Sequence, residues 1–139
     1  VPAIKPDIAI LHAAESDVYG NVRHCCGPGW IDLFLYRSAA RTIVQVEKII
    51  SNEDIRSNPW ATTIGGAASI VRMPYGAHPF YSRGYYVQDT KFTRDYFAAS
   101  SAGNGELDRF VEHYCREPDT HVDYLELLGI KRLLGLYEY

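Results

Sequence analysis

Three short apolar runs lie along the first half of the chain. Residues 7–14, DIAILHAA, are almost continuously apolar and rich in isoleucine, a pattern typical of a strand buried on both faces of a parallel sheet. Residues 42–50, TIVQVEKII, are rich in β-branched side chains and predict a second strand. A third run, about Ala68 to Met73, predicts another strand and leads directly into the segment MPYGAHPF. We therefore expect three strands in this half.

Between the first two runs, the apolar spacing changes from that of a strand to that of a helix. From Trp30 to Arg41, apolar side chains recur three and four positions apart, at Ile31, Phe34, Leu35 and Ala39. Turn signals precede this segment, at Gly20-Asn21 and at residues 27–29, Gly-Pro-Gly. A strand, a helix and a second strand form the crossover unit that joins parallel strands.

The rest of the chain is dominated by helix-start and helix-stop signals. Ser51, three positions before Asp54, predicts a short helix or turn that stops at Pro59. Three further helices are expected, capped by Asp89 or Thr90, by Asn104, and by Asp119 or Thr120, and ending before Gly103, at Pro118 and at Gly129. We predict an α/β fold: an open, mostly parallel sheet with flanking helices and a helical C-terminal tail.

Composition and charge exclude several classes of protein. The 139 residues are 47% apolar and 22% charged, which argues against disorder. A net charge of -3 gives no electrostatic reason to expect a nucleic acid or an anionic membrane as a partner. No run approaches the roughly 20 apolar residues that span a bilayer.

The cysteines favour a reducing compartment, and we expect a cytoplasmic protein. There are three, Cys25, Cys26 and Cys115, and an odd number with two adjacent is a poor disulfide framework. The HCC segment that contains the first two does not predict a metal site. Neighbouring side chains on a strand point to opposite faces, and no second half-site with ligand spacing follows.

Candidate functional residues lie at or near the ends of the predicted strands. In open α/β sheets, ligands bind beyond the carboxyl ends of the strands. The residues that we predict to line such a site are Gly20, Asn21, Glu47, Gly76, Ala77 and His78. Asparagine and backbone N–H groups beside glycine can polarise a carbonyl or bind an anion, and a histidine can donate or shuttle a proton.

Each of these positions also has a purely structural interpretation. Gly20-Asn21 is a common tight-turn pair, and a lone histidine beside a proline, such as His78, is often a hydrogen-bonded structural group. Glu47 is more anomalous, because burying a carboxylate is costly unless it is paired, for example with Arg72. The sequence lacks the phosphate-binding, nucleophile-elbow and metalloprotease motifs, so no single motif decides between the two interpretations.

Aromatic residues and arginines gather around and after the third predicted strand. The aromatic ones are Tyr75, Phe80, Tyr81, Tyr85 and Tyr86, close to Arg72 and Arg83. Tyrosine and arginine are typical of interface cores, and this use is favoured over the binding of an adenine and phosphates.

Three segments together resemble the A subunit of the family I CoA-transferases of the glutaconate CoA-transferase type. They are KPDIAILHAAESDVYGNV (residues 5–22), AARTIVQVEKII (residues 39–50) and VRMPYGAHP (residues 71–79). Members of that family look like P-D-V-A-[IL]-[IL]-H-A followed by G-N, then V-E-x-I-V, then V-P-Y-G-A-H-P. The occurrence of all three motifs in the same order makes the resemblance specific.

The resemblance implies an enzyme that works as part of a multi-chain complex. Its substrate would be an acyl-CoA thioester, with no permanently bound cofactor and no metal, and its partner a B-type subunit. In the transferases, the thioester is attacked by a glutamate of the B subunit. The nucleophile is therefore expected outside this chain, the catalytic residues within it are unknown, and Glu47 is given a supporting role.

The resemblance leaves two questions of function open. Proteins of this fold also look like acyl-CoA hydrolases and decarboxylases of glutaconyl-type CoA esters, and a non-catalytic assembly role is the alternative from another class. The A subunits of the family are also considerably longer than 139 residues. The resemblance implies that residues 1–139 are the C-terminal portion of a single CoA-transferase-like domain, with the N-terminal half of the A subunit as a missing partner.

Overall fold

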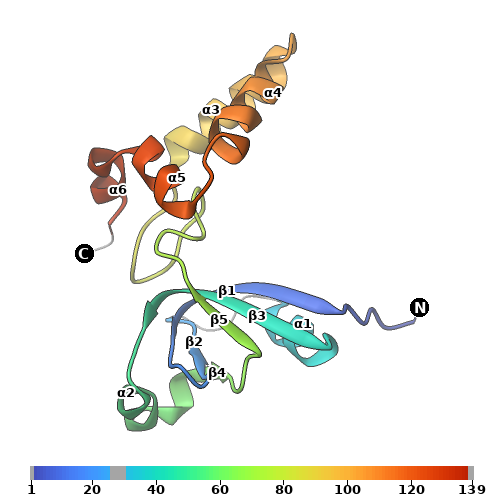
Figure 1. Ribbon diagram of the computed structural model, residues 1–139, viewed down its shortest axis with the longest axis vertical. Coiled ribbons are helices and arrows are strands. Elements are labelled where there is room, and N and C mark those ends of the chain that lie inside the picture. The colour runs from blue at the N-terminus through green and yellow to red at the C-terminus, as the bar shows by residue number, and fades with distance from the viewer. Residues whose placement is uncertain (1, 26–30, 138–139) are drawn as a thin grey trace. The chain divides into compact units, whose positions relative to one another are not determined.

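The computed structural model describes residues 2–25 and 31–137, and these fall into two compact units. The first unit, unit 1, takes the chain up to Ala77 together with Ser82–Tyr85, and unit 2 takes His78–Tyr81 and Tyr86–Tyr139 (Figure 1). Two compact units can belong to one evolutionary domain. The prediction that residues 1–139 are a portion of a single domain therefore stays a prediction.

Unit 1 is built on a five-stranded sheet in the order β4-β2-β1-β3-β5. Its strands are β1 (Ile8–Ser16), β2 (Val22–Arg23), β3 (Arg41–Ile49), β4 (Thr62–Ile64) and β5 (Ser69–Arg72). The three predicted strands, β1, β3 and β5, are parallel neighbours, whereas β2 and β4 pair antiparallel at the other side of β1. The mostly parallel sheet is thus confirmed. β2 and β4 were not expected, because two or three residues are too few to show an alternating pattern.

Two short helices connect the strands of unit 1. Helix α1 (Asp32–Ser38) follows β1 and β2, and it is shorter than predicted because Arg41 already pairs with Ile8 at the start of β3. Helix α2 (Asn52–Ser57) has the predicted capping box, and a 3-10 turn (Pro59–Ala61) follows it. The predicted turn at residues 27–29, together with Trp30 and Cys26, lies outside the described residues.

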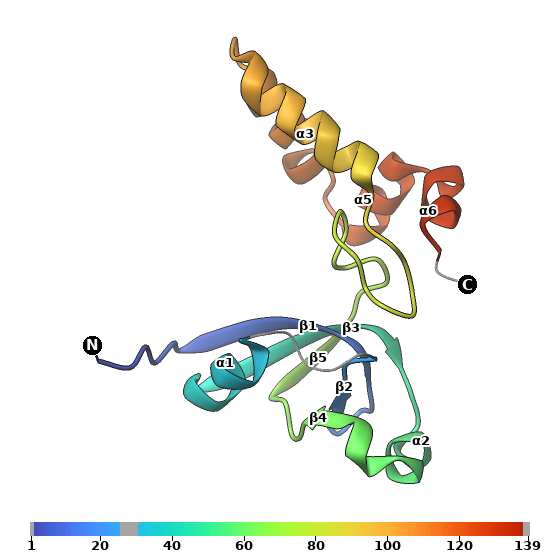
Figure 2. The same cartoon turned by 180° about the vertical axis from the view of Figure 1, so that it is seen from behind.

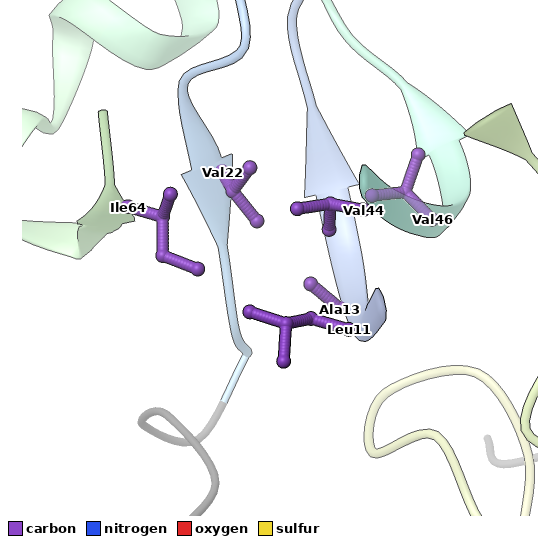
Figure 3. Close-up of a cluster of buried hydrophobic side chains, with 6 residues drawn as sticks. All are labelled: Leu11, Ala13, Val22, Val44, Val46 and Ile64. Atoms are coloured by element: carbon purple, nitrogen blue, oxygen red, sulfur yellow. The ribbon is translucent and has the colours of Figure 1, made fainter. Parts of the chain in front are cut away.

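A buried apolar cluster lies on one face of the sheet (Figure 3). It consists of Leu11, Ala13, Val22, Val44, Val46 and Ile64, all at most 5% exposed. Successive side chains of a strand point to opposite faces, so β1 and β3 each present every second residue to this core. The expectation that β1 is buried on both faces is wrong for its first half: Ile8 and Ile10 are 54% and 71% exposed in the described part of the chain.

Unit 2 is helical, as the tail was predicted to be (Figure 2). It contains α3 (Thr90–Ala102), α4 (Glu106–Val111), a π-helical turn (Glu112–Arg116), α5 (His121–Leu128) and α6 (Ile130–Leu136). Asp89 caps α3, and Thr120 caps α5 through a capping box. Gly105 stands at the cap of α4 in place of the predicted Asn104, and α6 was not predicted because Gly129 in the sequence signals only the end of a helix.

Aromatic rings hold the helices of unit 2 together. Phe92 of α3 makes edge contacts with Phe110 of α4 and with Tyr114 of the π-helical turn, at centroid distances of 5.1 and 4.7 Å. Such pairs stabilise a small helical unit beyond their buried area. Among the described helices, none combines the length and the apolar character that crossing a membrane requires.

Candidate functional site

A polar network lies on the face of the sheet opposite the apolar core. The pairing of β1 with β3 sets His12 directly beside Gln45, one residue out of phase with the core residues Ala13 and Val46. Glu47 lies two positions beyond Gln45 and therefore faces the same side. The alternation of the strands thus brings three polar side chains together at neighbouring positions.

The carboxylate of Glu47 is buried and held by two donors. Its side chain is 3% exposed, Oε1 lies 3.0 Å from His12 Nε2, and Oε2 accepts the backbone N–H of Tyr75 at 2.7 Å. These partners offset the cost of removing a carboxylate from water. The sequence suggests Arg72 as a partner, but Arg72 pairs in register with Val46, whose side chain belongs to the core on the other face.

The loop that follows β5 is fastened to this network. Its first residue, Met73, donates its N–H to the carbonyl of Val46 at 2.7 Å. Tyr75 has φ = +58°, a left-handed conformation that is uncommon outside glycine. Gly76 is closely packed, since a Cβ there would stand 2.8 Å from the Met73 carbonyl oxygen and 3.3 Å from Gln45 Nε2. The segment predicted as a site is therefore a tightly defined loop.

Two residues of the Ser82–Tyr85 segment bond to polar side chains of β1. Ser82 Oγ lies 3.3 Å from His12 Nε2, and Tyr85 donates its hydroxyl to Glu15 Oε1 at 2.9 Å. Burial, together with the neighbouring Glu15 carboxylate, raises the pKa of Tyr85, so this phenol stays protonated. Ser82 thus joins the network of His12 and Glu47, whereas Tyr85 is held separately by Glu15.

Gly20 and Asn21 belong to a different turn, organised by Asp17. The fully buried Asp17 carboxylate accepts the N–H groups of Tyr19 and Asn21 and the side-chain amides of Asn21 and Asn52, at 2.7–2.9 Å. Burial raises the pKa of Asp17, but these hydrogen bonds outweigh burial and the pKa is lowered. Asp17 is a buried anion that holds the Gly20-Asn21 turn against the start of α2.

Gly20 is required at its position by a close backbone contact. It has φ = +83°, and a Cβ there would lie 2.6 Å from the carbonyl oxygen of Ala67. It also lines an open cavity of about 420 Å³, together with Val18, Tyr19, Ile49, Ala67, Ala68, Ser69, Ile70 and Arg72. One predicted residue thus borders a space that could admit part of a ligand.

His78 lies in unit 2 and its side chain is fully buried. Nδ1 lies 2.6 Å from the Tyr124 hydroxyl, and Nε2 lies 3.3 Å from Asp89 Oδ2. Asp89 also caps α3 through the Phe92 N–H and pairs with Arg132 through both carboxylate oxygens. Burial lowers the pKa of His78, and this effect is larger than the rise that the Asp89 carboxylate causes. These contacts favour the structural interpretation of His78.

The structure therefore separates the predicted site residues. Glu47 and Gly76 meet in one network, half-buried Ala77 continues the same loop, Gly20 and Asn21 form the Asp17 turn, and His78 lies among the helices of unit 2. Sequence reasoning missed His12, Gln45 and Asp17. The position of His12 inside an apolar strand could have marked it as a candidate site residue. Its partners could be identified only from the pairing of β1 with β3.

Metal ligation finds no support in the described residues, among which no group of three or more His, Cys, Asp or Glu side chains is placed to hold an ion.

Comparison with known proteins identifies the family. The model of the coenzyme A transferase family matches residues 1–69. The A subunit of glutaconate CoA-transferase from Acidaminococcus fermentans is 36% identical over 138 residues, which cover 98% of this chain and 42% of that relative. The chain belongs to the coenzyme A transferase family.

A solved structure and a second relative also match the chain over most of its length. The crystal structure of glutaconate coenzyme A-transferase from Acidaminococcus fermentans matches it with a TM-score of 0.93 at 35% identity, over 100% of this chain and 44% of that one. The IpdA subunit of a cholesterol ring-cleaving hydrolase from Mycobacterium tuberculosis is 32% identical over 89% of this chain and 43% of its own length. The chain thus spans about two fifths of the length of these curated relatives.

Proposed function

We propose that this chain is part of the A subunit of an enzyme that transfers coenzyme A between carboxylic acids. The observation that carries the proposal is its 36% identity, over 98% of the chain, to the A subunit of a glutaconate CoA-transferase. Its substrate would be an acyl-CoA thioester, its partners the N-terminal part of the A subunit and a B-type subunit, and its compartment the cytoplasm. No permanently bound cofactor is needed for this chemistry.

Within the complex, we assign this chain a role in lining the acyl or thioester end of the substrate. The residues proposed for this role are Gly20, Asn21, Gly76 and Ala77, with Glu47 in support. His78, also expected in this role from the sequence, is left out because its buried contacts favour a structural one. The position of the loop at residues 73–77, just beyond the carboxyl end of β5, supports this role, because ligands of open α/β sheets bind at that edge. The attacking carboxylate is expected on the partner subunit.

The test is reconstitution of the complete complex. The protein is produced together with the N-terminal part of the A subunit and the B-type subunit, and the complex is supplied with acetyl-CoA and a panel of carboxylates that includes glutaconate. We expect new acyl-CoA to form only when an acceptor carboxylate is present. Absence of both acyl-CoA turnover and coenzyme A binding by the complex would refute the proposal.

Hydrolysis is the alternative that a relative supports, since the IpdA subunit belongs to a hydrolase. The same assay separates the two reactions. A hydrolase releases free coenzyme A without an acceptor, a decarboxylase releases carbon dioxide from a glutaconyl-type ester, and a transferase needs the second acid. We favour transfer, because the glutaconate CoA-transferase of Acidaminococcus fermentans has both the 36% identity and the TM-score of 0.93.

An assembly role without direct contact to the substrate is the alternative of another class. The buried side chain of His78 gives this alternative some weight. Glu47→Gln and His78→Ala distinguish the two. If both variants assemble and keep the turnover of the complete complex, the assembly role is favoured.

A further inference from the structure

The proton position on His12 follows from its neighbour Gln45. Gln45 Nε2 lies 3.0 Å from the carbonyl oxygen of Gly76 and 3.1 Å from His12 Nδ1. A carbonyl oxygen can only accept, so the amide group that faces Gly76 has to be the NH₂ donor. The same nitrogen faces His12 Nδ1, which therefore accepts. The hydrogen-bond network thus assigns the neutral His12 its proton on Nε2.

That proton points at Glu47. His12 Nε2 lies 3.0 Å from Glu47 Oε1, so the N–H donates to the buried carboxylate and leaves Oε2 for the backbone N–H of Tyr75. Ser82 Oγ, 3.3 Å away, shares the same nitrogen. A serine nucleophile needs a basic ring nitrogen and a carboxylate on the other one. Here both groups meet Nε2, so the cluster does not form a catalytic triad.

Two side chains that hold the loop after β5, Gln45 and Glu47, therefore both contact the His12 ring. Glu47 holds the N–H of Tyr75, and Gln45 holds the carbonyl of Gly76, the next residue. Tyr75 occupies the left-handed region, which is strained for a residue with a Cβ. Such a conformation persists only where the surroundings fix it. His12 contacts both Gln45 and Glu47, the side chains that hold the backbone here.

We propose that His12 is a positioning residue of the acyl-CoA site: it orients Gln45 and Glu47, which together fix the backbone of Tyr75 and Gly76. The proposal rests on the proposed function, which makes that loop part of the acyl-CoA site. The arrangement His12–Gln45–Glu47 and its two backbone contacts stand on geometry alone. In this role His12 acts through the shape of the loop.

The first test is spectroscopic and does not depend on turnover. In the native protein labelled uniformly with nitrogen-15, we expect His12 to show a protonated Nε2 and an unprotonated Nδ1, and the Tyr75 amide to exchange slowly. In the Gln45→Leu variant, the tautomer preference should weaken. A proton on Nδ1 of His12 in the unaltered protein would overturn the proposal.

The second test compares two substitutions in the assembled enzyme. His12→Gln keeps an acceptor for Gln45 and a donor for Glu47, whereas His12→Leu removes both. We expect His12→Leu to lower kcat by about 10- to 100-fold with a smaller change in KM, as for a displaced catalytic loop, and His12→Gln to restore most of the loss. His113→Gln, at an exposed histidine of unit 2, is the control and should leave both constants unchanged.

The outcomes separate this proposal from the proposed function. Equal kcat for the His12→Leu variant and the unaltered complex would overturn the role of His12 while leaving CoA transfer intact. A native complex without any acyl-CoA turnover would refute the proposed function. In that case the tautomer and the exchange of the Tyr75 amide still decide whether His12 controls the loop.

Discussion

The ion pair between Asp89 and Arg132 offers a quantitative test of how unit 2 is held together. The Asp89 side chain is 4% exposed and accepts from Arg132, from the Phe92 N–H and from His78. Burial raises the pKa of Asp89, but these hydrogen bonds outweigh it and lower the pKa to about 2, against an ordinary 3.8. The difference corresponds to roughly 2 kcal/mol that favours the folded state while the carboxylate is charged.

The perturbation is Asp89→Asn, which keeps an oxygen for the Phe92 N–H and removes the charge that faces Arg132. We expect the free energy of unfolding to fall by about 2 kcal/mol near neutral pH, somewhat more if the partly exposed Arg132 is left without compensation. Because the folded-state pKa is depressed, this contribution is present above about pH 4 and is lost as the pH falls toward about 2. The two proteins should therefore converge in acid.

The assay is denaturant unfolding followed by far-ultraviolet circular dichroism, which reports mainly on helices, at several pH values. Asp95→Asn is the matched control on the same helix, α3. Its carboxylate is 46% exposed and pairs with Lys91, so the change should be within about 0.5 kcal/mol. The reasoning would be refuted if Asp89→Asn unfolded like the unaltered protein near neutral pH, or if the difference persisted unchanged to about pH 2.

Three further changes test unit 1. Asp17→Ala leaves four partly buried N–H donors without their acceptor, and denaturant unfolding should show a loss of about 2–4 kcal/mol. Gly20→Ala places a Cβ 2.6 Å from the Ala67 carbonyl oxygen at φ = +83°, so the melting temperature should fall by several degrees, or the cavity beside it should change shape. Gly76→Ala places a Cβ 2.8 Å from the Met73 carbonyl oxygen but, unlike Gly20→Ala, at a position without positive φ. The melting temperature should therefore fall less than for Gly20→Ala, whereas turnover of the complex should fall at least tenfold, and unchanged turnover would contradict the role given to the loop.

Much of the secondary structure could be predicted because its causes are local. Apolar runs marked β1, β3 and β5, and side chains able to cap a backbone N–H marked the starts of α2, α3 and α5. β2 and β4 escaped prediction, because the pairing of β2 with β1 and of β4 with β2 is a property of the sheet and not of their few residues.

The candidate site was only partly predictable, because its contacts cross large distances in sequence. Glu47 was recognised as an anomaly, yet its partner His12 lies 35 positions earlier, and only the β1–β3 register brings the two together. His78 was adjacent in sequence to the loop that Glu47 fixes, but the fold buries its side chain among Asp89, Tyr124 and Phe92.

By itself, the sequence determined the fold class, the main strands and capped helices, and the resemblance to the coenzyme A transferases. These depend on periodicity, on side chains a few positions apart, and on three motifs in order. The tertiary structure alone decided which polar groups share a face and which are buried. A buried carboxylate is stabilised by donors that any part of the chain can supply, and strand pairing selects them: His12 and the Tyr75 N–H for Glu47.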